Sequence, residues 1–320
     1  MRLMVLRQFL FALPISLLVL SGALPAHAGY NEGLAAYKKG EAAQAAKEFL
    51  PLAQAGNAQA QVMLAQILMN GGKGVTKDVK TGMQWVQRSA EANNADAQIF
   101  LAQALLQGLH EQAKDPAGAA KWFERAAQAG DQRAMLPLAQ MKLQGVGMPA
   151  DPRGAVPWLE ILAAANNAAA HEILGTMALQ GNGMEKDYAK AARHLEAAVR
   201  QGDQSSAFVL GQLQLKGLGV AKNTEEGMRL ISQSANAGNY QAMVTLASML
   251  ANGSDDVDQD SRQAYKWITI VLNRAPQGDL FYSASGIETA LRSRLSSRQI
   301  EAAQAEASRF VVTPMKANAK

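Results

Sequence analysis

The sequence of 320 residues contains no cysteine, and this absence excludes several kinds of chemistry. Disulfide bonds cannot stabilise the fold, so its stability has to come from packing alone. Catalysis by a thiol and metal sites with cysteine ligands are excluded for the same reason.

Aromatic residues are also scarce, at 6% of the chain, although 48% of it is apolar. Abundant alanine with few aromatic residues favours helices that pack closely through small side chains over a β-rich core. The formal charge is +4, and basic and acidic residues are mixed along the chain. Because there is no basic stripe with interleaved aromatic residues, we do not expect nucleic acid as a partner.

Long apolar runs are absent except at the start of the chain. There, Arg2 and Arg7 precede the segment FLFALPISLLVL, and the small-residue motif AHA ends at Ala28. This pattern predicts a cleavable signal peptide over residues 1–28, and hence a periplasmic or secreted protein without a membrane anchor after cleavage. The alternative is an uncleaved anchor, which Pro14 and Gly22 disfavour because they break a short apolar run.

The rest of the sequence repeats every 36 to 37 residues. In four copies a tryptophan follows an aspartate by seven positions, so that all four tryptophans of the chain occupy one repeat position. The pairs are Asp78/Trp85, Asp115/Trp122, Asp151/Trp158 and Asp260/Trp267, with weaker copies at Asp187/His194 and Asn223/Leu230. A small residue follows each Asp or Asn by four positions, namely Gly82, Ala119, Ala155, Ala191, Gly227 and Ala264.

A second marker runs in phase with the first. It is an Asn or Asp preceded by Gly or Asn, at Asn57, Asn94, Asp131, Asn167, Asp203 and Asn239. Gly and Asn tolerate the left-handed conformation that closes a helix, and Asn or Asp caps the next helix. Each repeat is therefore predicted to be two antiparallel helices joined by a glycine-rich loop, with the small residue allowing close approach. The predicted fold is an all-α, α/α superhelical solenoid.

The loop glycines, as in Gly145-Val146-Gly147, could instead cradle a phosphate. No strand pattern precedes any of these loops, so the strand-to-helix setting of a phosphate loop is missing. We interpret them as turns.

These residues resemble the Sel-one-like repeat (SLR), a longer relative of the tetratricopeptide repeat. The segments from Ala169 to Asp203 and from Ser206 to Asn239 match its pattern A-x-A-x-x-x-L-[GA]…G-x-G-V-x-x-D-x-x-x-A-x-x-W closely. The resemblance implies six repeats over residues 58–275. A capping helix pair is expected at 29–57, capping helices at 276–312 and a disordered tail at 313–320. His194 and Leu230 depart from the family's tryptophan.

Catalytic and metal motifs are weak, and we predict no cofactor and no metal. The segment His171 to Gly175 begins like the zinc motif H-E-x-x-H but has Gly175 in place of the second histidine. The acidic loop Asp255–Asp260 has Ser261 and Trp267 where a calcium loop needs Gly and Glu, so we expect a solvated loop with Asp260 as a helix cap.

The predicted functional feature is a surface. In such a solenoid the first helices line a concave face that can hold a peptide or a protein. A polar ladder on these helices is a candidate recognition surface, or an ordinary solvated helix face. It consists of Gln66, Gln103, Gln140, Thr176, Gln212 and Ser248. A mostly apolar ladder, which either borders the groove or belongs to the core, consists of Val62, Ile99, Leu136, Glu172, Phe208 and Val244. Glu172 interrupts it, with Arg133 as a candidate neighbour.

We therefore expect an exported, non-enzymatic scaffold or adaptor for other envelope proteins or peptides. The resemblance implies a role in envelope assemblies, polysaccharide export, signalling control or host contact. The alternative is an enzyme or binder of cell-wall fragments or β-lactams that uses His171 or Glu172. Direct contact with polysaccharide is a third option, for which exposed aromatic residues are scarce.

Overall fold

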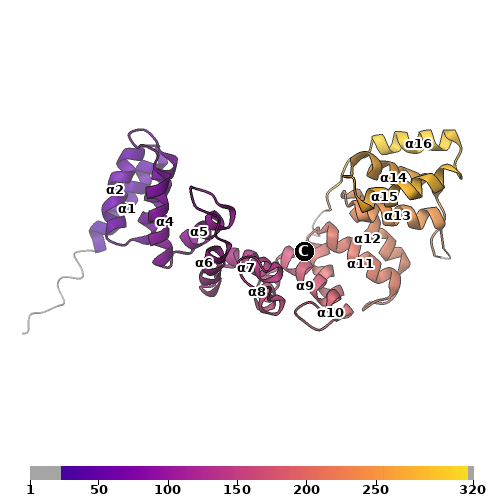
Figure 1. Cartoon of the computed structure of the whole chain (residues 1–320), viewed down its shortest axis with the longest axis horizontal. Coiled ribbons are helices and arrows are strands. Elements are labelled where there is room, and N and C mark those ends of the chain that lie inside the picture. The colour runs from indigo at the N-terminus through magenta and orange to yellow at the C-terminus, as the bar shows by residue number, and fades with distance from the viewer. Residues whose placement is uncertain (1–22, 255, 316–320) are drawn as a thin grey trace, which may run out of the picture. The chain divides into compact units, whose positions relative to one another are not determined.

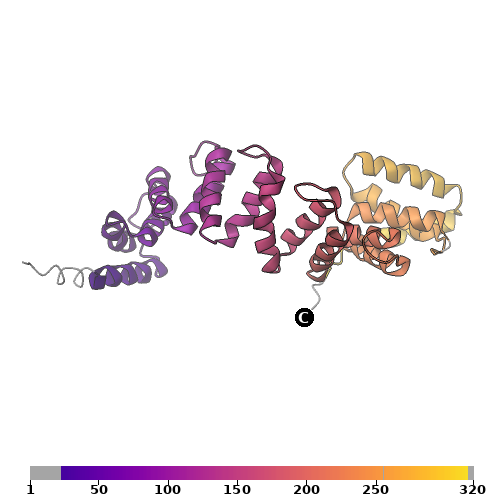
Figure 2. The same ribbon diagram turned by 90° about the horizontal axis from the view of Figure 1, so that it is seen from below.

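A computed structural model of the chain describes residues 23–254 and 256–315, with side chains from residue 29 onward. Every regular element in this part of the chain is an α-helix, which confirms the predicted all-α solenoid class. Consecutive helices run in antiparallel pairs (Figures 1 and 2). The helices are α1 (Ala23–Lys38), α2 (Ala42–Gln54), α3 (Ala58–Asn70), α4 (Val79–Glu91), α5 (Ala95–Gln107), α6 (Pro116–Gln128), α7 (Gln132–Gln144), α8 (Pro152–Ala164), α9 (Ala168–Gln180), α10 (Tyr188–Arg200), α11 (Gln204–Lys216), α12 (Thr224–Asn236), α13 (Tyr240–Asn252), α14 (Ser261–Arg274), α15 (Asp279–Arg292) and α16 (Ser297–Ser308).

The predicted Asp and Asn caps begin the helices. The Asp115 carboxylate accepts a hydrogen bond from the backbone N–H of Gly118 at 2.9 Å, and the Asn94 side chain accepts one from Ala97 at 3.0 Å. The same contact recurs at Asn57, Asp78, Asp151, Asn167, Asp187, Asp203, Asn223, Asn239 and Asp260. A cap of this kind stabilises a helix by about 1 kcal/mol.

The turns between repeats also follow the prediction. All six residues that precede the capping Asn or Asp of a first helix have positive φ: Gly56, Asn93, Gly130, Asn166, Gly202 and Gly238. Because glycine and asparagine tolerate this conformation best, the sequence pattern fixes where each pair of helices ends.

Small residues bring the two helices of a repeat close together, as predicted. A Cβ atom on Gly82 of α4 would overlap the Met69 side chain and lie 3.0 Å from the carbonyl oxygen of Ala65 on α3. In α11 a Cβ on Gly211 would lie 2.8 Å from the carbonyl oxygen of Gly227 on α12. A larger side chain at these positions would push the helices apart.

The glycine-rich loops have a second role, which we did not predict. In three loops the second glycine, Gly147, Gly183 or Gly219, lies against the first residue of the preceding repeat's second helix. Those first residues are Pro116 of α6, Pro152 of α8 and Tyr188 of α10. Each of these loops therefore connects two helices and also docks onto the preceding repeat.

The described residues form two compact units, and the boundary falls within α7, after Leu138. The first unit also includes residues 146–148. Its core contains Phe49 of α2, Leu64 of α3, Trp85 of α4 and Leu101 of α5. The second unit has one cluster around Leu195, Leu210 and Leu230, and another around Leu246, Trp267, Ile268 and Leu291.

The two ends of the described chain extend this packing. The short turn between α1 and α2 contains Gly40 at φ +77°. In the second unit α15 packs against α13 and α14, and α16 packs against α14. A Ser296–Gln299 capping box begins α16.

Of the tail at 313–320, for which disorder stays a prediction, the structure describes residues 313–315. The Thr313 N–H donates a hydrogen bond to the carbonyl of Asn236 at 2.8 Å, and Met315 packs against the cluster around Leu195. A free carbonyl at the end of α12 and an apolar contact hold this segment in place.

The predicted signal peptide at 1–28 lies outside the described residues, except for the backbone of 23–28 in α1. None of the helices in the described part of the chain has the length and apolar character needed to cross a membrane.

Candidate protein-binding surface

The predicted polar ladder lies on the first helices of the six repeats, α3, α5, α7, α9, α11 and α13. We use the name first-helix face for the surface that these side chains form on the first helices within each unit. The side chains of Gln66, Gln103 and Gln140 are exposed, whereas Thr176, Gln212 and Ser248 are half-buried. The capping contacts described above set the start of these helices, so equivalent positions recur in the same register within each unit.

In the first unit the ladder lies beside a hollow between α3 and α5. The hollow has a volume of about 240 Å³ and is lined by the apolar side chains of Val62, Met69, Val86 and Phe100. Gln66 and Asp96 supply polar groups to its wall. An apolar surface with a few polar groups at its edge is the usual composition of a site for a partner's side chain.

Some residues of the apolar ladder belong to the core, and others lie at the surface. Ile99 and Phe208 are buried, at 8% and 9% exposed, so these two positions belong to the core. Val62, Leu136 and Val244 are half-buried, and Val62 lines the hollow. In the first unit this ladder therefore contributes to both the core and the first-helix face.

Arg133, at the start of α7, lies in an acidic environment within the first unit. Its guanidinium contacts carboxylate oxygens of Asp96 and Asp131, each at 2.6 Å. The hydrogen bonds from Arg133 lower the pKa of Asp131, and both carboxylates raise the pKa of Arg133. The proximity of Arg133 to Glu172 stays a prediction.

Glu172, on α9, is a half-buried carboxylate in the second unit. Burial raises its pKa, and the nearby charge of Asp203, the cap of α11, raises it further. Within the described residues we find no hydrogen bond or ion pair of its carboxylate. The position is therefore suited to a cationic group of a partner, which would relieve the cost of the buried charge.

Ser248 lies at the end of the ladder, next to the C-terminal helices. With Ile287, Leu291 and Arg294 it lines a hollow of about 70 Å³ between α13 and α15. The Arg294 guanidinium donates to the carbonyl of Ala251 at 2.9 Å. Helix α15 therefore restricts access to this last position.

The structure brings together two histidines that sequence reasoning treated separately. The Nδ1 atoms of His171 on α9 and His194 on α10 lie 3.0 Å apart. Burial lowers the pKa of both imidazoles, and for His194 the charges of His171, Lys190 and Arg193 lower it further. The sequence offered one signal for this pair. His194 occupies the tryptophan position of its repeat, whose side chain is expected to face the neighbouring helix.

The histidine pair does not extend to a larger ligand set. In the described part of the chain no three histidine or acidic side chains come together as a metal site would require.

Two carboxylates of the acidic loop before α14, those of Asp256 and Asp260, form contacts within the protein. Asp256 accepts hydrogen bonds from Lys222 Nζ at 2.9 Å and from the Thr224 hydroxyl at 3.2 Å, and these contacts lower its pKa. Asp260 caps α14 through the N–H of Gln263. Because Lys222 and Asp256 belong to successive repeats, this loop also joins one repeat to the next. Asp255 lies outside the described residues.

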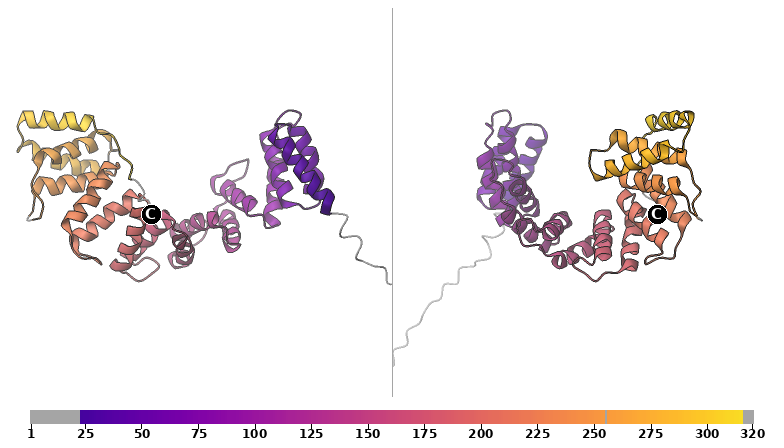
Figure 3. Two further views of the ribbon diagram at one scale, coloured as in Figure 1. Left: turned by 180° about the vertical axis from the view of Figure 1, so that it is seen from behind. Right: turned by 45° about the vertical axis from the view of Figure 1, so that its right-hand side comes forward.

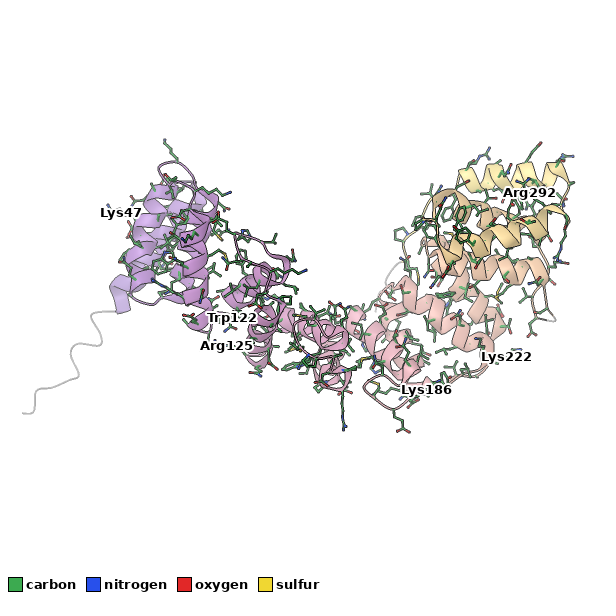
Figure 4. All side chains as sticks on the ribbon, in the orientation of Figure 1. Lys47, Trp122, Arg125, Lys186, Lys222 and Arg292 are labelled. Atoms are coloured by element: carbon green, nitrogen blue, oxygen red, sulfur yellow. The ribbon has the colours of Figure 1, made fainter. Side chains whose placement is uncertain are left out.

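Three of the four tryptophans pack in the apolar clusters, Trp85 and Trp122 in the first unit and Trp267 in the second. Trp85 and Trp267 are buried, whereas Trp122 and Trp158 are half-buried. Cations lie over three of the indoles, at 4.6 Å for Arg88 on Trp85, 5.0 Å for Arg125 on Trp122 and 4.5 Å for Lys266 on Trp267. Figure 4 shows Trp122 and Arg125 side by side.

Together, the paired helices and the loops docked on the preceding repeat define an α/α repeat protein whose first helices carry the polar ladder. The Sel1 repeat profile matches residues 58–94, 95–131, 132–167, 168–203, 204–239 and 241–269, which is more than half of the chain. The chain belongs to the Sel1 repeat family, as the resemblance predicted.

The chain is also similar to several solved structures. A Sel1 repeat protein from Oxalobacter formigenes is 27% identical, with a TM-score of 0.53, and the match covers 74% of this chain and 96% of that one. A protective antigen of uropathogenic Escherichia coli strains with an SLR fold is 20% identical, covers 89% and 76%, and has a TM-score of 0.38. A sel1 repeat protein from Klebsiella pneumoniae subsp. pneumoniae is 22% identical, covers 64% and 98%, and has a TM-score of 0.35. No curated protein matches the sequence.

Proposed function

We propose that this protein is an exported scaffold whose first-helix face binds partner proteins or extended peptides in a periplasmic envelope assembly or regulatory complex. Sel1 repeat proteins act as protein-binding scaffolds, which supports the general function. The hollow at Gln66 supports the location most directly, because apolar and polar predicted residues line one accessible site there.

The chemistry of the first-helix face suggests what it binds. Glutamine side chains both donate and accept hydrogen bonds, so an exposed ladder of them suits the backbone of an extended chain. In the second unit the half-buried Glu172 adds a preference for a Lys or Arg side chain of the partner. The partners are therefore envelope proteins or peptides with an extended, partly basic segment.

The location of binding is tested by changing the ladder without changing the core. Replacing Gln103, Gln140 and Gln212 by Glu leaves the size of the side chains unchanged and adds charge to the first-helix face. Crosslinking in the envelope, followed by mass spectrometry, should then lose the main partners. The matched control is Gln84→Glu, at an exposed glutamine on the second helix α4. If the partners are unchanged while helicity is intact, the first-helix face is not the binding surface.

Export rests on the N-terminal sequence. Processing after Ala28 leaves Gly29 as the first residue, so α1 of the mature protein would begin at the predicted cleavage site. N-terminal sequencing of protein from the periplasmic fraction should give GYNEGL. Protein that is found only in the cytoplasm and still begins at Met1 would contradict export while leaving the scaffold function open.

The enzymatic alternative has its own test. Turnover of nitrocefin or of peptidoglycan fragments by the purified protein, lost in both His171→Ala and Glu172→Gln, would replace the scaffold proposal by a hydrolase.

A further inference from the structure

The last described residues, Phe310–Met315, form an extended segment that lies across the second unit. We call this segment the strap. After α16 the chain turns back along the repeats toward α12, as Figures 1 and 3 show. The strap contacts the C-terminal ends of two second helices, at Arg274 on α14 and Asn236 on α12, and its last residues line one hollow together with Val199 near the end of α10.

The strap begins with an aromatic anchor. The ring of Phe310 packs edge-on against Trp267, with centroids 5.6 Å apart and an angle of 74° between the rings. The Arg274 guanidinium lies over the Phe310 ring at 5.4 Å and donates a hydrogen bond to the Phe310 carbonyl at 2.9 Å. One residue of the second-helix surface thus contacts both the side chain and the backbone of the strap.

The middle of the strap is held through the backbone. The Thr313 N–H donates to the carbonyl of Asn236 at 2.8 Å. Carbonyls in the last turn of a helix lack partners within the helix, so the end of a second helix offers acceptors to any extended chain that passes over it. Contacts of this kind do not depend on which side chain the bound residue carries.

The strap ends with an apolar anchor, five residues after Phe310. Met315 packs against the cluster that contains Leu195, Leu210 and Leu230. Next to it is an open hollow of about 390 Å³ lined by Val199, Arg229, Gln233 and Asn236, together with Thr313, Pro314 and Met315. Space therefore remains beside the strap for side chains larger than its own.

An aromatic anchor, backbone hydrogen bonds of both polarities and a second apolar anchor are the features of a bound extended peptide. We propose that the surface of Trp267, Arg274, Asn236 and Val199, which we call the second-helix groove, binds an extended segment of a partner protein. That segment carries an aromatic residue and, five positions later, a long apolar residue. The strap occupies the groove until such a segment displaces it.

This inference concerns a different surface from the first-helix face, so each proposal can fail without the other. A tethered segment has an effective concentration in the millimolar range. A free peptide must compete with it, and removing the strap should therefore strengthen binding of the peptide by at least roughly tenfold.

The test uses a fluorescein-labelled peptide of residues 308–315 and the chain truncated after Arg309. Fluorescence anisotropy should show binding to the truncated chain, and at least roughly tenfold weaker binding to the full chain. In the truncated chain Arg274→Ala should weaken binding at least fivefold, about 1 kcal/mol. The matched control Arg88→Ala removes another guanidinium that lies over an aromatic ring, that of Trp85 in the first unit, and it should not change binding.

A second set of peptides tests the partner. Unrelated sequences that keep a Phe and, five positions later, a Met should bind the truncated chain, and the same sequences with that spacing shortened by two residues should not. If only the chain's own sequence binds, the strap is a structural element of this protein and the proposal is wrong.

Two other outcomes would also overturn it. A truncated chain that keeps its helicity but does not bind the peptide at millimolar concentration lacks a peptide groove. A full chain that dimerises, and becomes monomeric on truncation, has a second copy as the occupant. If truncation unfolds the protein, the full chain with Phe310→Ala and Met315→Ala takes its place, and the loosened strap should admit the labelled peptide.

Discussion

The carbonyl oxygen of Pro116 occupies the space into which a Cβ atom on residue 147 would project, and only glycine fits there. Gly147 lies in the loop between α7 and α8, whereas Pro116 begins α6, so this contact joins one repeat to the preceding one. The same relationship recurs between Gly183 and Pro152 and between Gly219 and Tyr188. The glycine-rich loops are therefore part of the interface between repeats.

Gly147→Ala should destabilise the protein far more than Gly130→Ala. Both glycines have positive φ, +74° and +89°, so alanine costs about 1 kcal/mol of backbone strain at either position. Only Gly147 is also in close contact with the preceding repeat, whereas a Cβ on Gly130 would meet nothing within 4 Å. The overlap should add about 1–3 kcal/mol, measurable by urea denaturation. Equal midpoints for the two variants would show that the loop moves away without cost.

The histidine pair should make the second unit sensitive to mild acid. Burial lowers the pKa of His171 and His194 below 6.5, so the unfolded chain binds protons first as the pH falls. The free energy of unfolding is therefore highest, as far as these two groups determine it, above about pH 6.5 and decreases as the pH falls below that value. Between pH 7.5 and pH 5.5 the Tm of the protein should fall by roughly 2 °C more than that of His194→Leu. Leucine occupies the equivalent position at Leu230 and is buried there. Parallel pH profiles of the two proteins would argue against this role.

Glu172→Gln should stabilise the protein at neutral pH. The folded-state pKa of Glu172 is raised above 4.5, so its ionisation costs free energy that is absent when the carboxyl is protonated in both states. The variant should have a Tm about 1 °C higher at pH 7, and the gain should disappear near pH 4. Thermal unfolding at both pH values checks this, with Glu185→Gln, an exposed glutamate, as the control. A gain at both pH values would have a cause other than ionisation.

Removing a helix cap should lower the stability of the protein, and another repeat shows which residue can replace the cap. Asp115→Ala removes the acceptor for the Gly118 N–H and should cost about 1 kcal/mol. Asp115→Asn should cost much less, because Asn223 caps α12 in the same way. Denaturation midpoints of the two variants provide the comparison. If Asn is as harmful as Ala, the charge of Asp115 matters more than the hydrogen bond.

Much of the fold could be read from local signals. Asp115 and Asn94 cap helices because a short polar side chain can reach the free N–H groups of a first turn. Gly130 and Asn166 end repeats because few residues tolerate positive φ. The candidate surface was less predictable. Gln66 and Val62 share a hollow, but Ile99 of the same ladder is buried, since burial depends on what neighbouring helices place opposite each position.

The sequence by itself determined the repeat, because caps and left-handed turns act within a few positions along the chain and recur in each of the six repeats. Only the tertiary structure decided which distant groups meet: His171 with His194, Lys222 with Asp256, and Thr313 with Asn236. These contacts join residues from different helices and loops, and for the strap from the far end of the chain. Their distances follow from how the helices stack, a property that no local pattern of residues encodes.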